Sequence, residues 1–457
     1  MALRETSTSF DSDLFRQELV NLIDLRHPLA QLASRIDWQA CQDQFGGLYA
    51  AGVGRPGHPI RLMVGLQLLK HTSNLSDEEV VALWVENPYW QYFCGEQYFS
   101  HHSPIDPSLM TGFRKRVGQT GCEFILSLTV SAGIATRAVA KSSLSVVNVD
   151  TTVQDKAVAF PTDARLLNKA RLALVRHAHK LGVVLRQSYR DVGRAAFVRS
   201  QRYAHARQYN RAKAQTKKLR TYLGRIIRDI ERKTQTHQVK PEHSHLARLL
   251  EISRRIWSQR KQRQEGEVPK IYSVHAPEVE CIAKGKVHKQ YEFGVKVGVV
   301  STNKESFVVG ARAMPGNPYD GHTLKECLEQ AQRVSHVAPT EVYTDRGYKG
   351  HGCATEALKV WIAGTRRGVT KAVQRKLKRR NAVEPVIGHM KSDGRLARNF
   401  LKGIEGDAMN ALLCGAGHNM RKILKKLRLF CAQYGVSLHT FLERLQSMGQ
   451  QLQLRVA

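Results

Sequence analysis

The sequence predicts an α/β protein in which a mixed sheet with helices is interrupted by a long basic helical insertion and preceded by an all-α N-terminal part. Three observations support this prediction. Helical periodicity dominates up to about residue 140. Strand patterns appear at residues 144–150 and return after residue 290. Between them, residues 165–270 change to helical periodicity and to a large positive charge.

The charge of the chain predicts a polyanionic partner. The 457 residues include 71 Lys and Arg against 39 Asp and Glu, a formal net charge of +32. This excess is larger than solubility requires and favours nucleic acid or an anionic membrane surface. No apolar run approaches the roughly 18 residues of a spanning helix. The first residues, MALRETSTSFDSD, lack the apolar core of a signal peptide.

The cysteines point to a reducing compartment. The eight cysteines are scattered and form no CxxC pair, so neither a zinc site nor a disulfide framework is expected. Their spacing is typical of buried free thiols in a reducing cytosol. We therefore expect a cytoplasmic protein whose leading partner is DNA or RNA.

The N-terminal part reads as short helices. Pro59 suits the first turn of a helix, and mostly apolar residues follow it at helical spacing. Ser76 and Glu79 then form an S-x-x-E capping box that opens a second helix. Two helices joined by a tight turn fit a helix-turn-helix, and they fit any helical bundle equally well. The basic cluster FRKRVG at residues 113–118 either contacts phosphates or forms a solvated helix face.

The stretch VVNVDTTVQD begins as an apolar strand and places Asp150 where the apolar run stops. One interpretation is that Asp150 starts the turn after the strand, a position that Asp favours. The other is that a strand end holds this carboxylate rigidly for metal binding. The residue alone does not decide between them.

The segment 165–270 carries most of the excess charge. It contains 28 Lys and Arg against 7 Asp and Glu, a net charge of +21. Apolar stripes at residues 219–230 and 246–256 predict an antiparallel helical hairpin with its turn at THQVKPEH. A charge run is usually a solvated face. Here too little acid is present to balance like charges one turn apart, so we expect DNA to lie against these helices.

After the insertion the strand pattern returns. Residues 291–300 and 306–314 read as a hairpin joined by STNKE, and HTLKECLEQAQRV reads as a helix. EVYTDRGYKG gives a strand that ends at Asp345, with Gly347 and Gly350 freeing the backbone after it. KVWIAG is a further strand. Asp345 therefore repeats the pattern of Asp150.

A third carboxylate lies further along the chain. Apolar residues at i, i+3, i+4 and i+7 between positions 383 and 390 predict a helix. Arg380, Glu384 and Lys391 follow a neighbouring face, and Pro385 is expected to start or kink this helix. Arg380 and Glu384 form a surface ion pair in one interpretation. In the other, Glu384 is a metal ligand beside DNA phosphates.

Hard oxygen ligands from separate elements are what a metal-dependent phosphoryl-transfer site needs. We expect Asp150, Asp345 and Glu384 to converge on such a site. The reserve carboxylates, each ranked below Glu384, are Asp155, Asp163, Asp320 and Asp393. His322 is predicted to be a loop or core residue rather than a ligand.

These motifs together resemble those of bacterial insertion-sequence transposases of the DDE class, in the group with a Tyr-Arg-Glu-Lys signature. That signature reads Y-x2-R-x3-E-x6-K, and Arg380, Glu384 and Lys391 match its last three positions. Leu377 stands at the Tyr position, so that contact is absent or made by another residue. VNVDTT and YTDRGY resemble the segments of the first and second aspartate. MPGNPYDGHTL resembles the family's loop after the third strand.

The resemblance implies a ribonuclease-H-like catalytic domain. In it, Asp150, Asp345 and Glu384 would hold two Mg²⁺ ions, with Mn²⁺ as a substitute, while Arg380 and Lys391 would hold DNA phosphates. It also implies a nucleoid-associated protein that acts on double-stranded DNA, at element ends and at target DNA, as a homodimer on paired ends.

The domain organisation that follows has four parts. They are a helical N-terminal domain for end recognition or dimerisation (residues 1–140), a catalytic domain in two segments (141–164 and 271–405), the basic helical insertion (165–270) and the C-terminal helices (406–457). The expected reaction is cleavage at terminal inverted repeats and joining of the 3′ ends to target DNA. Two alternatives stay open: an inactive DNA-binding descendant of such an enzyme, and a structure-specific nuclease on the same fold.

Overall fold

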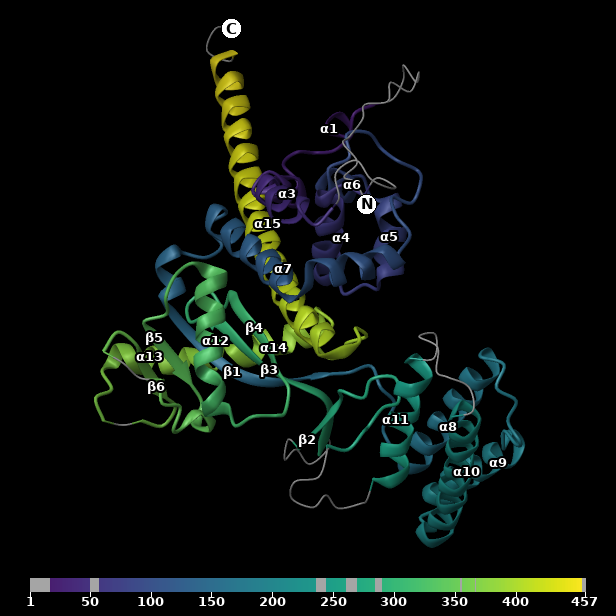
Figure 1. Cartoon of the computed structure of the whole chain (residues 1–457). Coiled ribbons are helices and arrows are strands. Elements are labelled where there is room, and N and C mark those ends of the chain that lie inside the picture. Colours follow the sequence, from purple (N-terminus) through teal and green to yellow (C-terminus); the bar gives the residue numbers. More distant parts are fainter. Residues whose placement is uncertain are drawn as a thin grey trace. The chain divides into compact units, whose positions relative to one another are not determined.

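The computed structural model describes residues 17–49, 57–235, 244–259, 269–283, 290–353, 356–365 and 367–453, with side chains up to residue 429 (Figure 1). The chain divides into two compact units. Unit 1 consists of Met1–Gln154, Lys296–Leu401 and Glu405–Ala457, and unit 2 consists of Asp155–Val295 and Lys402–Ile404. The predicted turn at residues 236–243 and the first residues of the chain lie outside the described ranges.

Unit 1 begins with seven helices in its described part. They are α1 Leu19–Leu22, α2 Pro28–Ala33, α3 Trp38–Gly46, α4 Ile60–Ser73, α5 Asp77–Glu86, α6 Pro88–Cys94 and α7 Ser108–Ala135. The predicted capping box is confirmed: Ser76 Oγ accepts the Glu79 N–H, and Glu79 Oε2 accepts the Ser76 N–H. Asn74, in the left-handed conformation, ends α4 and makes the tight turn between α4 and α5.

The basic cluster at residues 113–118 is only partly the surface feature that the sequence predicts. Arg114 is buried, and its guanidinium donates to both carboxylate oxygens of Asp77, at 2.9 and 2.6 Å. Lys70 Nζ donates to the same carboxylate at 2.7 Å. Arg114 is therefore neither solvated nor available to a phosphate, and it joins α7 to the start of α5. Only Lys115 and Arg116 of this cluster are exposed basic residues.

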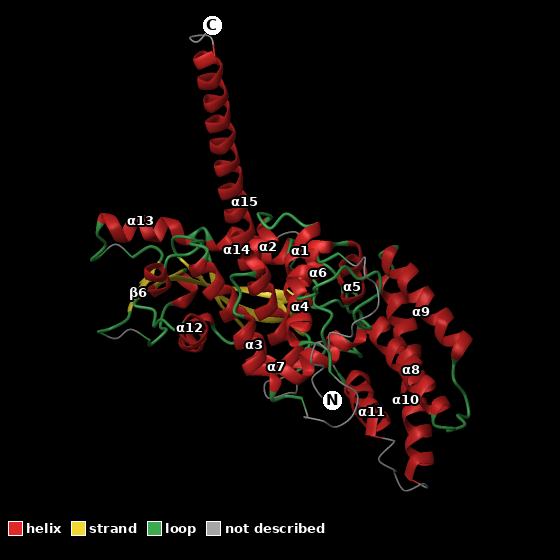
Figure 2. Cartoon of the chain, turned by 90° about the horizontal axis from the view of Figure 1, so that it is seen from above, coloured by secondary structure: helices red, strands yellow, loops and turns green. Residues whose placement is uncertain are grey.

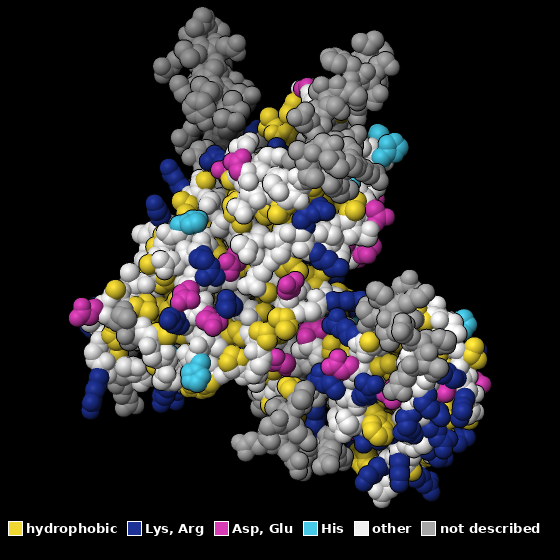
Figure 3. Space-filling model, in the orientation of Figure 1, with side chains coloured by type: hydrophobic (Ala, Val, Ile, Leu, Met, Phe, Trp, Pro, Cys, Tyr) yellow, Lys and Arg dark blue, Asp and Glu magenta, His cyan; other side chains and the backbone are white. Residues whose placement is uncertain are grey.

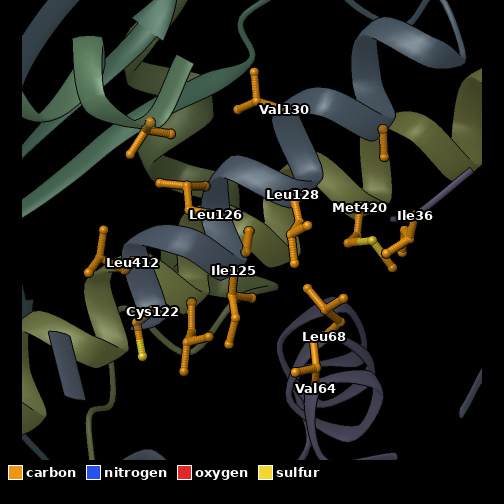
Figure 4. Close-up of a cluster of buried hydrophobic side chains, with 14 of the residues drawn as sticks. Ile36, Val64, Leu68, Cys122, Ile125, Leu126, Leu128, Val130, Leu412 and Met420 are labelled. Carbon is orange, nitrogen blue, oxygen red and sulfur yellow. The ribbon is translucent and has the colours of Figure 1, made fainter. Parts of the chain in front are cut away.

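The core of unit 1 continues from the N-terminal helices to the sheet. Figure 4 shows side chains of α7, including Ile125 and Leu128, among side chains of α4 and of the helix that ends the chain. That helix, α15, spans Gly403–Gln453. Close packing here requires glycine, because a Cβ on Gly417 would lie 2.3 Å from the His71 carbonyl oxygen.

The sheet lies in the middle of unit 1. Its strand order is β4-β3-β1-β5-β6, with β3 antiparallel to β4 and with β1, β5 and β6 parallel to one another. The strands are β1 Val146–Asp155, β3 Tyr291–Thr302, β4 Val308–Met314, β5 Glu341–Thr344 and β6 Lys359–Ile362. The strands predicted after residue 290 are all confirmed. Short 3₁₀ turns precede β1 and follow β5, at Lys141–Ser145 and Arg346–Tyr348.

The prediction that a strand ends at Asp150 is wrong. β1 continues for five residues beyond it, because Thr151, Thr152 and Val153 are β-branched residues that suit a strand. Thr152 and Val153 are also buried. The pairing of β1 with β5, in contrast, ends at Asn148, before Asp150.

Helices cover both faces of the sheet. In both views, α12 (Asp320–Ser335) and α7 lie on one face, and α13 (Lys371–Arg380) and α14 (Val383–Ser392) lie on the other (Figures 1 and 2). The sequence predicts Arg380 and Glu384 along a face of one helix, but the helix is interrupted between α13 and α14. Pro385 explains this interruption of the helix. Proline has no N–H to donate to the Asn381 carbonyl oxygen, and its ring would clash with that carbonyl. At the third residue of α14, in the first turn, proline is tolerated.

Unit 2 contains four helices in its described part. They are α8 Asp163–Lys180, α9 Arg190–His205, α10 Tyr209–Gln235 and α11 Ser244–Ser258. They enclose a core of their own, to which Leu167, Leu223 and Ile256 contribute. The predicted hairpin covers only α10 and α11. The sequence did not predict α8 as a separate helix, although its Leu166, Leu167 and Leu174 belong to this core. The strand β2 (Glu280–Ala283), which the sequence did not predict, pairs with residues 291–294 of β3.

Two expectations from composition can be compared with the described residues. The seven cysteines whose side chains the structure describes are free, and five of them are buried. None of the described helices is long and apolar enough to cross a membrane.

Candidate active site

Two aspartates meet on adjacent strands. β1 and β5 run parallel with Val147 opposite Val342 and Asn148 opposite Tyr343. Continuing this register by two residues places Asp150 beside Asp345, and side chains at paired positions point to the same face of a sheet. Asp345 directly follows β5, where its carboxylate accepts the Gly347 N–H at 2.9 Å. The fold therefore brings together two residues almost two hundred positions apart.

The electrostatics of this pair are unfavourable for a second negative charge. Burial, and then the nearby Asp345 carboxylate, raise the pKa of Asp150 to about 6. Arg380 and the Thr151 N–H oppose the shift, and Asp320 adds to it. A carboxylate destabilised in this way gains from a cation beside it. The pair is thus two neighbouring carboxylates whose charges a cation would stabilise.

Asp320 is closer to this pair than the sequence suggested. It begins α12, and its Oδ1 accepts from Thr151 Oγ1 at 3.1 Å and from Lys296 Nζ at 2.9 Å. On the other side, a Cβ at Gly347 would lie 3.1 Å from Asp320 Oδ2 and 3.1 Å from Asp345 Oδ1. The carboxylates of Asp320 and Asp345 therefore both lie close to Gly347, and a side chain at this position would crowd them.

Arg380 links the aspartates to the predicted glutamate. It is the last residue of α13 and is buried, with its Nη1 3.7 Å from Asp150 Oδ2 and its Nη2 3.8 Å from Glu384 Oε1. Both distances are too long for hydrogen bonds. Within the described residues, the buried Nη1 atom has no hydrogen-bond partner. A buried donor of this kind suits an additional acceptor such as a phosphate oxygen.

Glu384 lies at the edge of this group. It is the second residue of α14, and 70% of its side chain is exposed. Lys391 lies two turns further along the same helix. Among the described residues, no three His, Cys, Asp or Glu side chains stand close enough together to hold a metal ion. The convergence of Asp150, Asp345 and Glu384 on a metal therefore stays a prediction.

The other reserve residues lie elsewhere. Asp393 pairs with His389 at 2.8 Å. Asp163 begins α8 and Asp155 ends β1, both in unit 2. His322 is exposed in the first turn of α12, so it is neither a loop residue nor a core residue. No sequence signal marked Asp320 above these residues, because only the fold brings the start of α12 beside β1 and β5.

Two protein-family models match parts of the chain. Residues 17–116 match the family model described as Transposase domain (DUF772), and residues 273–420 match Transposase DDE domain. A protein of Rhizobium meliloti named "Uncharacterized protein ORF8 in nfe locus" is 54% identical over 202 residues, which is 44% of this chain and 97% of the relative. No solved structure matches the chain.

The two matches fall mainly in unit 1, although the second begins in unit 2, before β2. The first covers the N-terminal helices up to the first part of α7, and the second covers β2 to β6 and the helices that follow, including Asp345, Arg380 and Glu384. The resemblance inferred from the carboxylates and the Arg-Glu-Lys spacing is thus confirmed: the chain belongs to the insertion-sequence transposases of the DDE class.

Proposed function

We propose that this protein cuts DNA at the terminal inverted repeats of its own element and joins the 3′ ends to target DNA by two-metal phosphoryl transfer. Its family implies an enzyme that binds DNA and cleaves it with divalent metal ions. The observation that carries the finer proposal is the side-by-side placement of Asp150 and Asp345, with the raised pKa of Asp150, next to a buried arginine. The order of the sheet and its two helical layers support a ribonuclease-H-like catalytic domain.

The residues present fit Mg²⁺. Asp150, Asp345 and Glu384 would supply hard oxygen ligands, and Mn²⁺ would substitute because it accepts the same ligands. Bound Mg²⁺ ions would stabilise the attacking and leaving oxygens of the displacement. Asp320 would help to fix the site, since Lys296 and Thr151 hold its carboxylate beside Gly347.

Two basic residues would position the DNA. The Nη1 atom of Arg380, buried and unsatisfied within the described chain, would donate to a phosphate flanking the scissile one. Lys391 would hold a second phosphate from α14, as the signature implies. Leu377 at the signature Tyr position lies on α13, so any contact that the Tyr makes in relatives would come from another group here.

The N-terminal helices are better suited to pairing subunits than to reading DNA. In a helix-turn-helix the second helix enters the major groove. The second helix here, α5, carries four acidic residues and no Lys or Arg, which would repel DNA phosphates: Asp77, Glu78, Glu79 and Glu86. We therefore place dimerisation on DNA ends, rather than base readout by α5, in residues 1–140.

Two other functions make different predictions. A DNA-binding descendant without catalysis would have no use for carboxylates held beside one another and beside the phosphate-binding Arg380. A structure-specific nuclease on the same fold would cut DNA without joining it. The site residues of a nuclease and of a transposase can be identical, so the reaction products must separate them.

A strand-transfer assay tests the proposal. Duplexes that carry the element's terminal repeat with flanking DNA are labelled at the 5′ end of the strand whose 3′-hydroxyl is freed by cleavage, and they are incubated with a supercoiled target plasmid and Mg²⁺. We expect label to become covalently attached to the plasmid. A matched duplex with a scrambled repeat is the control. Cleavage without joined product would identify a nuclease, and binding without cleavage would identify an inactive descendant.

A further inference from the structure

Unit 2 contains a pocket in which four of the eight lining residues are arginines. Its volume is about 600 Å³, and it lies between α10 and the segment before α9. Arg186, Tyr189, Arg225, Arg228 and Arg232 contribute to its lining. Lys and Arg side chains also gather on the visible face of this unit in Figure 3. The pocket is thus a defined hollow within a generally basic surface.

The segment that forms one wall is held in place. Buried Arg171 of α8 donates to the Ser188 carbonyl oxygen at 3.0 Å and to Asn168. Tyr189 adopts a left-handed backbone conformation, with a φ of 51°, and its ring stacks on that of Tyr222 of α10 at 4.7 Å. Arg225 Nη1 donates to the Tyr189 hydroxyl at 3.4 Å. This wall is therefore a preorganised structure.

The acidic residues of the lining are already paired. Asp229 is buried, accepts the Arg186 N–H at 2.8 Å, and lies near Lys233 and Arg232. Glu231 pairs with Arg254 of α11 at 2.6 Å.

The arginines of the lining keep most of their charge. Among the described residues, the exposed side chains of Arg186, Arg225 and Arg228 have no ion pair with an acid. Like charges held this close repel one another, and an anion between them would remove that repulsion.

We propose that this pocket binds backbone phosphates of duplex DNA during transposition. A guanidinium group pairs with phosphate oxygens through two parallel N–H donors. Several guanidinium groups around one hollow can hold a phosphate in a defined place, which charges scattered over a basic surface do not. The inference rests on the proposed function for its ligand. It goes beyond it by assigning DNA contact to one pocket of unit 2 rather than to the charge of the whole unit.

Charge-matched double variants test this assignment in the full-length protein. Arg186→Gln with Arg228→Gln removes two charges from the pocket. Arg199→Gln with Arg202→Gln removes two exposed charges from α9, outside the pocket lining. Affinity for a fluorescent duplex is measured by anisotropy over a range of salt concentrations without a divalent metal. Arg186→Lys with Arg228→Lys keeps the charge, and circular dichroism reports folding.

The pocket variant is expected to bind about 10-fold more weakly near physiological salt and to lose about two from the slope of log K against log salt. The α9 variant is expected to lose less than half of either amount, and the Lys variant to recover part of the affinity. Equal losses in the pocket and α9 variants would overturn the proposal, because they would show an effect of net charge alone.

A free nucleotide is the other source of the same phosphate chemistry. A nucleoside triphosphate is therefore added as competitor to the wild type and to the pocket variant. Equal displacement of DNA from both supports duplex phosphates as the ligand. Displacement from the wild type alone would overturn the proposal in favour of a nucleotide site. End cleavage is followed in parallel. If only the pocket proposal is wrong, the enzyme still cleaves in an Mg²⁺-dependent reaction that requires Asp150, so the two proposals can fail separately.

Discussion

Asp150→Asn is expected to reduce end cleavage and joining by at least about a thousand-fold in Mg²⁺, the scale on which loss of an essential catalytic group acts. The substitution keeps the shape of the side chain and removes the charge that would bind the metal. In the wild type, the Thr151 N–H donates to Asp150 Oδ1 at 2.8 Å. The side-chain oxygen of Asn can still accept this hydrogen bond. Rates of cleavage of a labelled repeat-end duplex measure the effect.

DNA affinity of the same variant is expected to stay within about 2-fold of the wild type, because affinity comes from phosphate contacts of basic residues. Asp43→Asn makes the identical chemical change at an exposed site on α3 and is the matched control. Near wild-type cleavage by Asp150→Asn would show that this residue is not a metal ligand. An equal loss in Asp43→Asn would point to a general defect of the preparation.

The second large effect concerns stability. Asp77→Ala is expected to lower the free energy of unfolding by about 3–5 kcal/mol, since it removes one partner of a buried charge network. Lys70 and Arg114 are both buried and would be left without the carboxylate that they share. Burial lowers the pKa of Lys70 to about 8, although Asp77 opposes this shift. Denaturant unfolding followed by circular dichroism measures the change.

Glu86→Gln at the other end of α5 is the control, because an exposed acid there should change stability by no more than about 0.5 kcal/mol. A loss of under 1 kcal/mol for Asp77→Ala would mean that the network contributes little.

The same network predicts how stability depends on pH. Burial alone would raise the pKa of Asp77, but the Arg114 hydrogen bonds and the Lys70 charge lower it to about 2. A carboxyl with a depressed folded pKa contributes stability above its ordinary value, near 3.8. That contribution is lost as the pH falls through about 2. The wild type should therefore lose more stability than Asp77→Ala between about pH 4 and pH 2.

The sequence predicted those elements whose signals are local. The capping box at Ser76 and the helix of residues 383–390 depend on neighbouring residues, and both are confirmed. So is the hairpin of β3 and β4, whose turn and alternation are local. β1 is longer than the sequence predicts, because the apolar run stops at Asp150 whereas the β-branched Thr151 and Thr152 continue the strand.

Features that depend on tertiary packing could not be predicted. The burial of Arg114 required knowing that Asp77 faces it from another helix. The position of Asp320 depends on where α12 starts relative to β1, whose Thr151 lies 169 residues earlier in the chain. The pairing of Asp150 with Asp345 follows from the register of β1 and β5, which periodicity alone does not fix.

Iron-directed cleavage of the protein backbone tests most directly whether three carboxylates share one metal site. Fe²⁺ in place of Mg²⁺, with ascorbate and peroxide, generates radicals that cut the chain near the bound metal, and mass spectrometry locates the cuts. We expect cuts around Asp150, Asp345 and Glu384 that excess Mg²⁺ suppresses and that Asp150→Asn abolishes. Cuts around Asp150 and Asp345 with Asp320 in place of Glu384, or no cuts that Mg²⁺ suppresses, would contradict this account.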